Sequence, residues 1–558
     1  MEIWSFDTGK INCKMIKVRK YIFSLVLFVL AIIPVLSLFH PGFPVTHDGQ
    51  DHVARIANFY LNLTQGNLIP RWAPNLNWGY GHPILEFLYP LPSYIASIFH
   101  FLGLSFVDST KVVYGLGMVL SLYFMYLWLS QFLSKQSSLF GAVLFTYAPY
   151  RFVDLYVRGD VGENLAFAFV PLVLFFAYKT YKTKDIKYPV LGAISLAFLI
   201  LAHNAIALMF VPFILLYCLI LLYISKFNKR LIFNLFSLIV LGFTLSAFFW
   251  LPALLEGKYT LRNIVTAGGY VGRFVSFQSL IYGPWSYGQT GTFTVQYGPL
   301  QWISILISPL TIYFFRKDKQ KLLISLLLLF FTAVSTFLML EQSSFIWSKV
   351  MLLQNFQFPW RFLAVIVFTT AVLGAFLFES VEKRLNKNIL LGLLILLVLV
   401  ISSFYSQPKG YQNKPESFYS GIYNSTTDTG ESSPIWSVRF MEHRPSAPAQ
   451  IVEGGGSIKE TVHKATYRKF DYNSQEESRV LLNILYFPGW TVYVDGKEVS
   501  TIFQDPMYRG LMTIRVAGGQ HTIEVVFKDT RLRQISELIS AVSLLIILGF
   551  MGFRFVKK

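Results

Sequence analysis

The sequence predicts a polytopic α-helical membrane protein of about twelve spans, with a β-sandwich-like domain before the last span. Of its 558 residues, 54% are hydrophobic and only 14% are charged, unlike an average soluble domain. Apolar stretches long enough to cross roughly 30 Å of hydrocarbon recur from Tyr21 to Tyr405, and once more near the C-terminus. We expect a transmembrane domain over 1–405, a linker and β-rich domain over 406–534, and a last helix with a basic tail over 535–558.

The placement of lysine and arginine predicts the orientation. Basic residues cluster beside apolar segments, at 10–20, 179–187, 226–230, 316–321, 383–387 and 554–558. If these clusters are cytoplasmic, as the positive-inside rule expects, both termini lie on the cytoplasmic side of the cell membrane. Most of the net charge of +18 is then an orientation signal. Nucleic-acid binding then has no support. The spans that place every basic cluster on the cytoplasmic side are about 21–40, 111–133, 138–150, 164–181, 188–202, 205–224, 231–251, 300–315, 322–340, 362–380, 389–405 and 535–553.

One apolar segment, Ile84–Leu104, cannot cross the membrane if every basic cluster is to stay on the cytoplasmic side. It follows Pro83 and is interrupted by Pro90 and Pro92, and proline breaks the regular hydrogen bonding of a helix. We therefore expect an interfacial or re-entrant helix on the extracytoplasmic face.

The same model places the longest polar segments on the extracytoplasmic face. From 407 to 456 proline, serine, tyrosine and glycine are frequent, which is typical of linkers. Strand-like runs follow at 480–486, 491–494, 512–516 and 521–527, with turn signals at Asp495-Gly496 and Gly518-Gly519, and predict a β-rich domain. The other extracytoplasmic loops, which we expect to carry the site, are 41–110, 151–163, 252–299 and 341–361.

The strongest candidate residue is Asp48, in the stretch Thr46-His47-Asp48-Gly49-Gln50-Asp51-His52-Val53-Ala54-Arg55 just after the first span. Ionisable groups at that depth are costly and suggest a functional site. Asp48 could act as a general base or ligate a divalent metal. The alternative is that it only caps the following helix. His47 and Asp51 are candidate substrate-binding residues beside it.

The first loop continues with aromatic residues among glycines and prolines. Arg71 lies in Pro-Arg-Trp at 70–72, and Tyr80 and His82 lie in Gly-Tyr-Gly-His-Pro at 79–83. Such rigid irregular backbone could stack on sugars or hold a lipid headgroup. An ordinary interfacial aromatic belt is the alternative.

The second loop has two arginines and several carboxylates immediately before a span. Arginine binds phosphate oxygens bidentately, so Arg151 and Arg158 are candidates for a phosphate-bearing headgroup, with Asp154 beside them. Asp160 and Glu163 are three residues apart and could share a helical face, so they are candidate catalytic groups. A salt-bridge cluster at a helix entrance is the alternative.

Three later candidates lie at segment ends. His203 interrupts two apolar segments, Glu256 follows Trp-Leu-Pro-Ala at 250–253, and Arg361 lies in Gln-Phe-Pro-Trp-Arg-Phe at 357–362. Each is a candidate substrate-binding residue.

Taken in order, these motifs resemble a bacterial family of membrane proteins described as 6-pyruvoyl-tetrahydropterin synthase-related, close to YfhO-type proteins. The stretch Tyr-Phe-Pro-Gly-Trp-Thr-Val-Tyr-Val-Asp-Gly-Lys at 486–497 is also similar to the outer domain of YfhO-type proteins. No residue pattern here resembles the zinc site of a soluble pterin synthase. The family in turn resembles the GT-C glycosyltransferase superfamily.

The resemblance implies an inverting glycosyltransferase that uses a polyprenyl-phosphate-linked sugar on the extracytoplasmic face. The acceptor would be an envelope glycan, teichoic acid, lipid or protein. The superfamily's first-loop acidic residue matches Asp48, and its second-loop acidic group matches Asp160 or Glu163. Neither loop contains Asp-x-Asp, so a metal-free reaction and one that uses Mg²⁺ or Mn²⁺ both stay open. A lipid or polysaccharide flippase and an inactive envelope scaffold are the alternatives.

Overall fold

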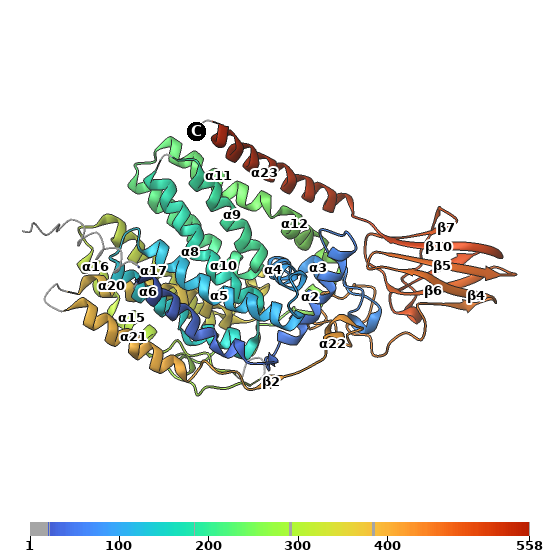
Figure 1. Ribbon diagram of the computed structural model, residues 1–558, viewed down its shortest axis with the longest axis horizontal. Helices are drawn as coiled ribbons and strands as arrows, with labels where there is room; N and C mark the ends of the chain where they lie inside the picture. The colour runs from blue at the N-terminus through green and yellow to red at the C-terminus, as the bar shows by residue number, and fades with distance from the viewer. Residues whose placement is uncertain (1–20, 22, 184, 289–292, 382–385, 557–558) are drawn as a thin grey trace, which may run out of the picture.

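The computed structural model describes residues 21, 23–183, 185–288, 293–381 and 386–556. The basic cluster at 10–20 and parts of those at 383–387 and 554–558 lie outside this range. The described chain consists of a large helical part and a β-domain that stands at one end of it (Figure 1). It is a polytopic helical membrane protein with a C-terminal β-sheet domain, as the sequence predicts.

Within the described residues, six helices are long and apolar enough to cross a membrane: Phe106–Leu129 (α5), Val161–Lys182 (α8), Asn204–Ile224 (α10), Lys319–Met339 (α17), Pro359–Ser380, which contains α20 (Leu363–Ser380), and Arg531–Phe550 of α23 (Arg531–Val556). A seventh span results if α11 (Lys229–Leu245) and the helices from Ala247 to Tyr259, joined at a bend of 66°, count as one. Phe23–Phe39, α9 (Lys187–Ala202) and α21 (Lys387–Ser403) are shorter apolar helices. The predicted number of twelve spans stays a prediction.

Two of the predicted spans correspond to short or broken helices. Segment 138–150 overlaps α6 (Lys135–Thr146), and segment 300–315 divides into α15 (Pro299–Ile307) and α16 (Pro309–Phe314). The break occurs where Pro309 begins the second helix, because proline removes a backbone donor and clashes with the preceding turn.

The segment Ile84–Leu104 forms only short helices, α3 (Ile84–Phe87) and α4 (Leu91–Phe101). At about 1.5 Å per residue, α4 is roughly 16 Å long, too short to cross the hydrocarbon core. The helices α2 (Gly49–Thr64), α3 and α4 lie at the end of the helical part that faces the β-domain (Figure 1).

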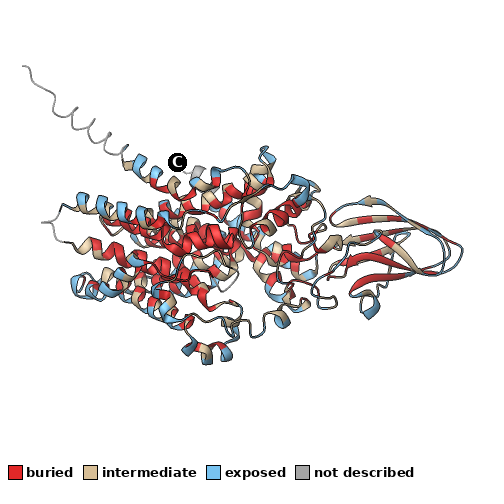
Figure 2. Cartoon of the chain, turned by 90° about the horizontal axis from the view of Figure 1, so that it is seen from below, coloured by how far each residue is buried: buried red, intermediate tan, exposed pale blue. Residues whose placement is uncertain are grey.

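Buried residues lie mainly along the centre of the helical part, as the colours of Figure 2 show. Large apolar side chains at its periphery are exposed, among them Phe233, Phe236, Leu306 and Leu545. Exposed apolar surface of this kind marks contact with a partner or a membrane, and on helices of this composition it fits lipid.

The β-domain contains two antiparallel sheets that share one apolar core. One sheet has the strand order β4-β5-β10-β7-β8 and the other β3-β6-β9. The Asp495-Gly496 turn joins β7 to β8 with positive φ at both residues, as a type I′ turn requires. The four predicted strands are confirmed as β6, β7, β9 and β10. The strands are β3 (Ala449–Glu453), β4 (Ser457–His463), β5 (Tyr467–Ser474), β6 (Ser478–Leu485), β7 (Trp490–Val494), β8 (Lys497–Val499), β9 (Leu511–Val516) and β10 (Gly519–Phe527).

The β-domain rests on the first loop. The Trp72 ring is 2% exposed and packs edge-on against Trp490, with ring centroids 5.3 Å apart. Trp78 and Tyr80 pack against the same core, and the backbone amide of Leu485 donates to the carbonyl of Tyr80 at 3.1 Å. The aromatic motifs of this loop therefore attach the β-domain to the helical part.

Candidate functional site

The first and second loops meet through their backbones. The amide of Asp48 donates to the carbonyl of Arg158 at 2.9 Å. Gly159, with φ of +71°, follows, and a Cβ there would lie 2.3 Å from Thr46 Oγ1. Glycine is therefore required at 159, both for its left-handed backbone conformation and for this close approach. The two loops richest in candidate residues therefore lie against each other.

The Asp48 side chain does not cap the helix that it precedes. Asp48 occupies the N-cap position of α2 but makes no side-chain capping bond; instead, the amide of Gly49 donates to Thr46 Oγ1 at 3.2 Å. The Asp48 carboxylate is exposed and forms no hydrogen bond or ion pair with any described residue. The protein around it displaces water, which raises the pKa of Asp48 above its ordinary value, and Arg158 opposes that shift.

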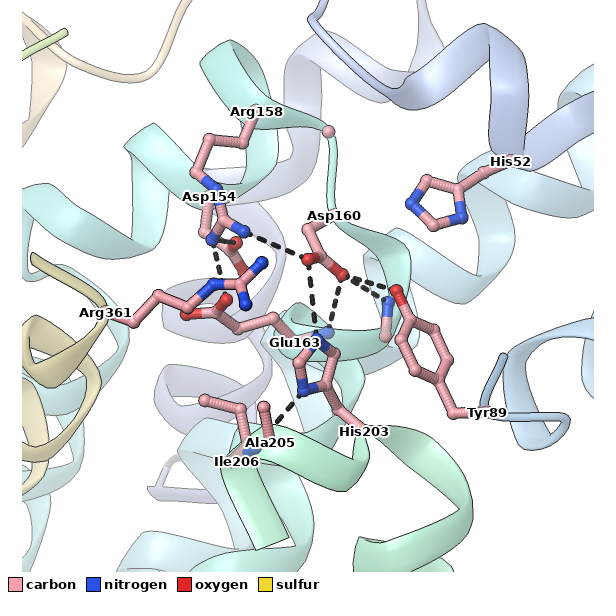
Figure 3. A network of polar contacts seen from close by, with 12 residues as sticks. His52, Tyr89, Asp154, Arg158, Asp160, Glu163, His203, Ala205, Ile206 and Arg361 are labelled. Carbon is pink, nitrogen blue, oxygen red and sulfur yellow. Dashed lines mark hydrogen bonds and ion pairs between the residues drawn. The ribbon is translucent and has the colours of Figure 1, made fainter. Parts of the chain in front are cut away.

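Arg158 is buried and binds three carboxylates (Figure 3). Its Nη1 lies 2.6 Å from Glu163 Oε2 and 2.8 Å from Asp154 Oδ1, and its Nη2 lies 3.1 Å from Asp160 Oδ2. We call these four residues the Arg158 cluster. Because its guanidinium already has these partners, Arg158 is not free to hold a phosphate.

Asp160 and Glu163 also have local structural partners. Asp160 caps α8, since its Oδ1 accepts from the amides of Gly162 and Glu163 at 3.1 and 2.9 Å. The same oxygen accepts from Tyr89 Oη at 2.8 Å. Glu163 Oε1 accepts from Tyr150 Oη at 2.6 Å. These two carboxylates therefore organise the start of α8.

Asp160, Glu163 and His203 could hold a metal ion by their spacing, because one ligand atom from each lies within 4.8 Å of the others. Their present partners fit that role poorly. His203 Nδ1 accepts from the amide of Ile206 at 3.2 Å, so in neutral histidine the proton is on Nε2, which faces Asp160 Oδ2 at 3.6 Å. Arg158 already supplies a cation to both carboxylates.

A row of aromatic rings leads from the first loop to the fourth. The His47 ring lies 6.1 Å from Phe293, Phe293 lies 4.9 Å from Trp360, and Trp360 stacks on Phe358 at 5.1 Å between ring centroids. Arg158 lies over Trp360, 4.9 Å from its centroid. Phe358 is therefore connected to the Asp48 region by packed rings.

Arginines gather around Phe358 without carboxylate partners. Arg273 and Arg361 lie 4.7 and 5.0 Å from its ring centroid. Burial lowers the pKa of Arg262, the carboxylate of nearby Glu431 opposes this shift, and Arg361 adds to it. Among the described residues, no carboxylate forms an ion pair with Arg262, Arg273 or Arg361. Figure 3 shows Arg361 extending towards the Arg158 cluster, and its Nε is buried without a partner. We call these three residues the arginine triad.

Sequence reasoning identified Arg361 of this triad and missed Arg262 and Arg273. A usable signal was present, because Glu256 is the only acidic residue in 252–299. Arginines in a loop that poor in acids have few carboxylates with which to pair.

Arg55, the last residue of the stretch that begins at Thr46, lies on α2. It is 7% exposed; its Nε donates to Thr427 Oγ1 at 2.9 Å and its Nη1 lies 3.3 Å from His52 Nδ1. Asp51 accepts from Tyr423 Oη at 2.9 Å. Residues of the 407–456 linker thus cover the first turns of α2, which the linker's composition did not indicate.

Arg71 and Glu256 lie in a separate buried ion network. Arg71 binds Glu86 and Glu537 at 3.0 and 2.8 Å, and Glu256 binds Arg533 at 2.6 Å. This network joins the first and third loops to the start of α23. It places neither residue beside Asp48.

Three further candidates also lie outside the Asp48 site. Tyr80 packs under the β-domain, and buried His82 lies 3.2 Å from Ser433 Oγ through its Nε2. Arg151 is fully buried, contacts Ser121 Oγ at 3.1 Å, and lies 4.1 Å from the centroid of Phe167. Arg151 is therefore enclosed within the helix core.

The fold and its buried polar loops define an integral membrane protein with a β-domain at one end. The chain belongs to the family described as "6-pyruvoyl-tetrahydropterin synthase related domain; membrane protein", whose model matches residues 85–409. The matched region contains the Arg158 cluster and the arginine triad and begins after Asp48. An uncharacterized protein of Lactococcus lactis subsp. cremoris (strain MG1363) is 30% identical over 266 residues, which cover 46% of this chain and 42% of that protein. The chain thus spans about two fifths of that relative.

The chain is also similar to two solved structures at low TM-score. The apo oligosaccharyltransferase of Archaeoglobus fulgidus has a TM-score of 0.43 and 15% identity, over 75% of this chain and 62% of that one. The arabinofuranosyltransferase AftD from Mycobacteria has a TM-score of 0.41 and 14% identity, over 69% of this chain and 27% of that one. At these values the similarity assigns neither a reaction nor a substrate to this chain.

Proposed function

We propose that this protein is a membrane glycosyltransferase that moves a sugar from a polyprenyl-phosphate-linked donor to an extracytoplasmic acceptor hydroxyl, with inversion. The observation that carries the proposal is the unpartnered carboxylate of Asp48 in a region that also holds arginines without acidic partners. A general base and a site for a leaving phosphate are the two parts that such a transfer needs.

Asp48 is the proposed base. It accepts the proton of the acceptor hydroxyl as that oxygen bonds to the anomeric carbon, while the bond from this carbon to the phosphate oxygen breaks. The raised pKa of Asp48 makes its carboxylate a stronger base than an ordinary aspartate. Because the carboxylates of the Arg158 cluster are already bound, Asp48 is the free one, which favours a single displacement with inversion.

The arginine triad is the proposed site for the leaving phosphate. Negative charge develops on the phosphate as the glycosidic bond breaks, and preorganised cations stabilise it most where water is excluded. Arg273 and Arg361 form no ion pair with a described carboxylate, and Arg262 lies near Glu431 without an ion pair to it, so none of the three has to break an ion pair among the described residues to bind it. The Arg158 cluster holds the second loop in place without contacting the donor phosphate.

The test is sugar transfer from a panel of radiolabelled polyprenyl-phosphate sugars by purified protein. We expect Asp48→Asn to lower transfer by roughly 10²- to 10⁴-fold, the usual value of general-base assistance, with its thermal unfolding unchanged. Asp108→Asn is the matched control, since Asp108 is paired with Lys111 at 2.9 Å. Transfer at the wild-type rate by Asp48→Asn would reject the assignment, and retained transfer in EDTA would support a metal-free reaction.

Lipid or polysaccharide transport is the second candidate. The observation that favours it is the buried ionisable group formed by the Arg158 cluster and His203, because such groups also serve as ion or proton pathways. Translocation of a labelled polyprenyl-phosphate sugar across reconstituted vesicles, with no transfer from any donor, would support this function in place of the enzyme.

A further inference from the structure

The 407–456 linker carries a groove of about 530 Å³ beside α2. One wall is α22 (Glu416–Ser420) and the other is the loop that follows it. The volume lies within the range of pockets that bind small molecules. The lining residues are Pro415, Ser417, Phe418, Gly421, Ile422, Tyr423, Asn424, Ser425 and Arg444.

The groove combines apolar faces with fixed polar groups. Phe418 and Ile422 are 37% and 42% exposed, and the Phe418 ring meets Tyr423 edge-on at 5.5 Å between centroids. Arg444 is held by bonds of 3.0 Å from its Nε to Asn424 Oδ1 and from its Nη2 to the carbonyl of Ile422. It forms no ion pair within the part of the chain that the structure describes, so donors of its guanidinium are left for a ligand.

One lining residue connects the groove to the Asp48 region. Tyr423 Oη donates to Asp51 Oδ1 at 2.9 Å, and Asp51 follows Asp48 by three residues, about 4.5 Å along the axis of α2. A molecule in the groove would thus lie next to the first turn of the helix that begins at Asp48.

We propose that this groove binds the saccharide chain of the acceptor, an inference that rests on the proposed glycosyl transfer. Aromatic and aliphatic side chains pack on the C–H faces of sugar rings. Hydroxyl, amide and guanidinium groups, here from Ser417, Asn424 and Arg444, pair with sugar hydroxyls. A lipid tail would leave these polar groups unpaired, which is costly.

The experiment measures direct binding of oligosaccharides to the full-length protein in detergent by saturation-transfer NMR and microcalorimetry. The probes are maltotriose, cellotriose, the trimer of N-acetylglucosamine and a glycerol-phosphate hexamer. We expect at least one probe to bind wild type, and Phe418→Ala and Arg444→Ala to weaken that binding tenfold or more. Arg515→Ala, at an exposed arginine of β9, is the control and should bind as wild type does.

The variant Asp48→Asn separates this inference from the proposed function, because it should lose transfer and keep saccharide binding. Binding that depends on Phe418 and Arg444 in a protein with no transferase activity would reject the transferase and retain the groove as a saccharide site. Failure of every probe to bind folded wild type, or wild-type binding by both groove variants, would overturn the inference even if transfer is observed.

Discussion

At the scale of single residues, what distinguishes the polar groups is whether they have partners. Asp48 has none among the described residues, whereas Asp160 caps a helix and binds Arg158. Both are acidic residues at the start of a helix, and the sequence offers no local difference that separates the two roles. The difference lies in the backbone: Asp160 has the extended conformation of a capping residue, with φ of −84° and ψ of 97°, whereas Asp48 has φ of −112° and ψ of −6°.

The raised pKa of Asp48 predicts an acidic limb in the pH profile of transfer. A base works only when deprotonated, so kcat/KM should fall as pH falls through the pKa of Asp48, with a midpoint above the ordinary value for aspartate of about 3.9. Initial rates between pH 4 and 8 (about the range in which carboxylates and histidines titrate) measure it. A rate that increases on acidification through this range would contradict the role of base.

Removing one cation of the arginine triad should weaken use of the donor. We expect Arg361→Ala and Arg273→Ala each to lower kcat/KM for the donor by about 10- to 100-fold, since a hydrogen bond to a charged group contributes roughly 1.5–3 kcal/mol. Arg→Lys at either position should recover part of this loss. Lys258→Ala, at an exposed lysine of the loop 252–299 that also contains Arg273, is the control. An equal loss of kcat/KM in that variant would argue against a specific phosphate site.

At the scale of elements, the Arg158 cluster connects the irregular second loop to α8. The helix turn Val153–Arg158 precedes Gly159, which reverses the chain so that Arg158, Asp160 and Glu163 converge. Three buried carboxylates without a cation would repel one another in a region of low dielectric. This cluster therefore controls the local stability of the second loop.

Removing that cation should destabilise the protein. We expect Arg158→Met to cost about 3–5 kcal/mol, as is typical when one partner of a buried ion pair is deleted, and to lower the Tm in detergent. Arg158→Met combined with Glu163→Gln should recover part of the loss, because one fewer carboxylate is left unpaired. A Tm unchanged from wild type in the single variant would show that the cluster is not stabilising.

At the scale of the whole molecule, the β-domain is attached through the first loop and through α23. Trp72 is enclosed by Trp490 and Phe527, and the ion network of Arg71, Glu86, Glu256 and Arg533 joins the loops to α23. Residues far apart in the sequence thus attach the β-domain to the helical part together. Motifs that appear in sequence to be substrate-binding are used for it.

Truncating this attachment should loosen the β-domain without unfolding the helical part. We expect Trp72→Ala to cost about 3–5 kcal/mol locally, the usual effect of deleting a buried aromatic ring, and to speed hydrogen exchange in β7 and β10. Trp72→Phe should have a smaller effect. Exchange in α5 and α20 serves as the internal control, and equal acceleration there would indicate global destabilisation instead.

The orientation inferred from lysine and arginine can be tested in intact cells. In a background lacking Cys13 and Cys218, Lys497→Cys in the β-domain should react with a membrane-impermeant maleimide. Lys229→Cys, at the start of α11, should react only after permeabilisation. The reverse pattern would invert the topology and place Asp48 on the cytoplasmic face.

The membrane class, the β-rich domain and the order of the polar loops follow from the amino-acid sequence alone. These features depend on local properties, namely the length of apolar runs, the alternation of apolar and polar residues along strands, and turn pairs such as Asp495-Gly496. Tertiary structure decided which polar residues meet. Arg262 and Arg273 belong to a different loop from Arg361. Arg71 and Glu256 lie in the ion network at α23 and not beside Asp48. The physical reason is that a charge is neutralised by whichever opposite charge the fold brings within a few ångströms, and that distance is unrelated to separation along the chain.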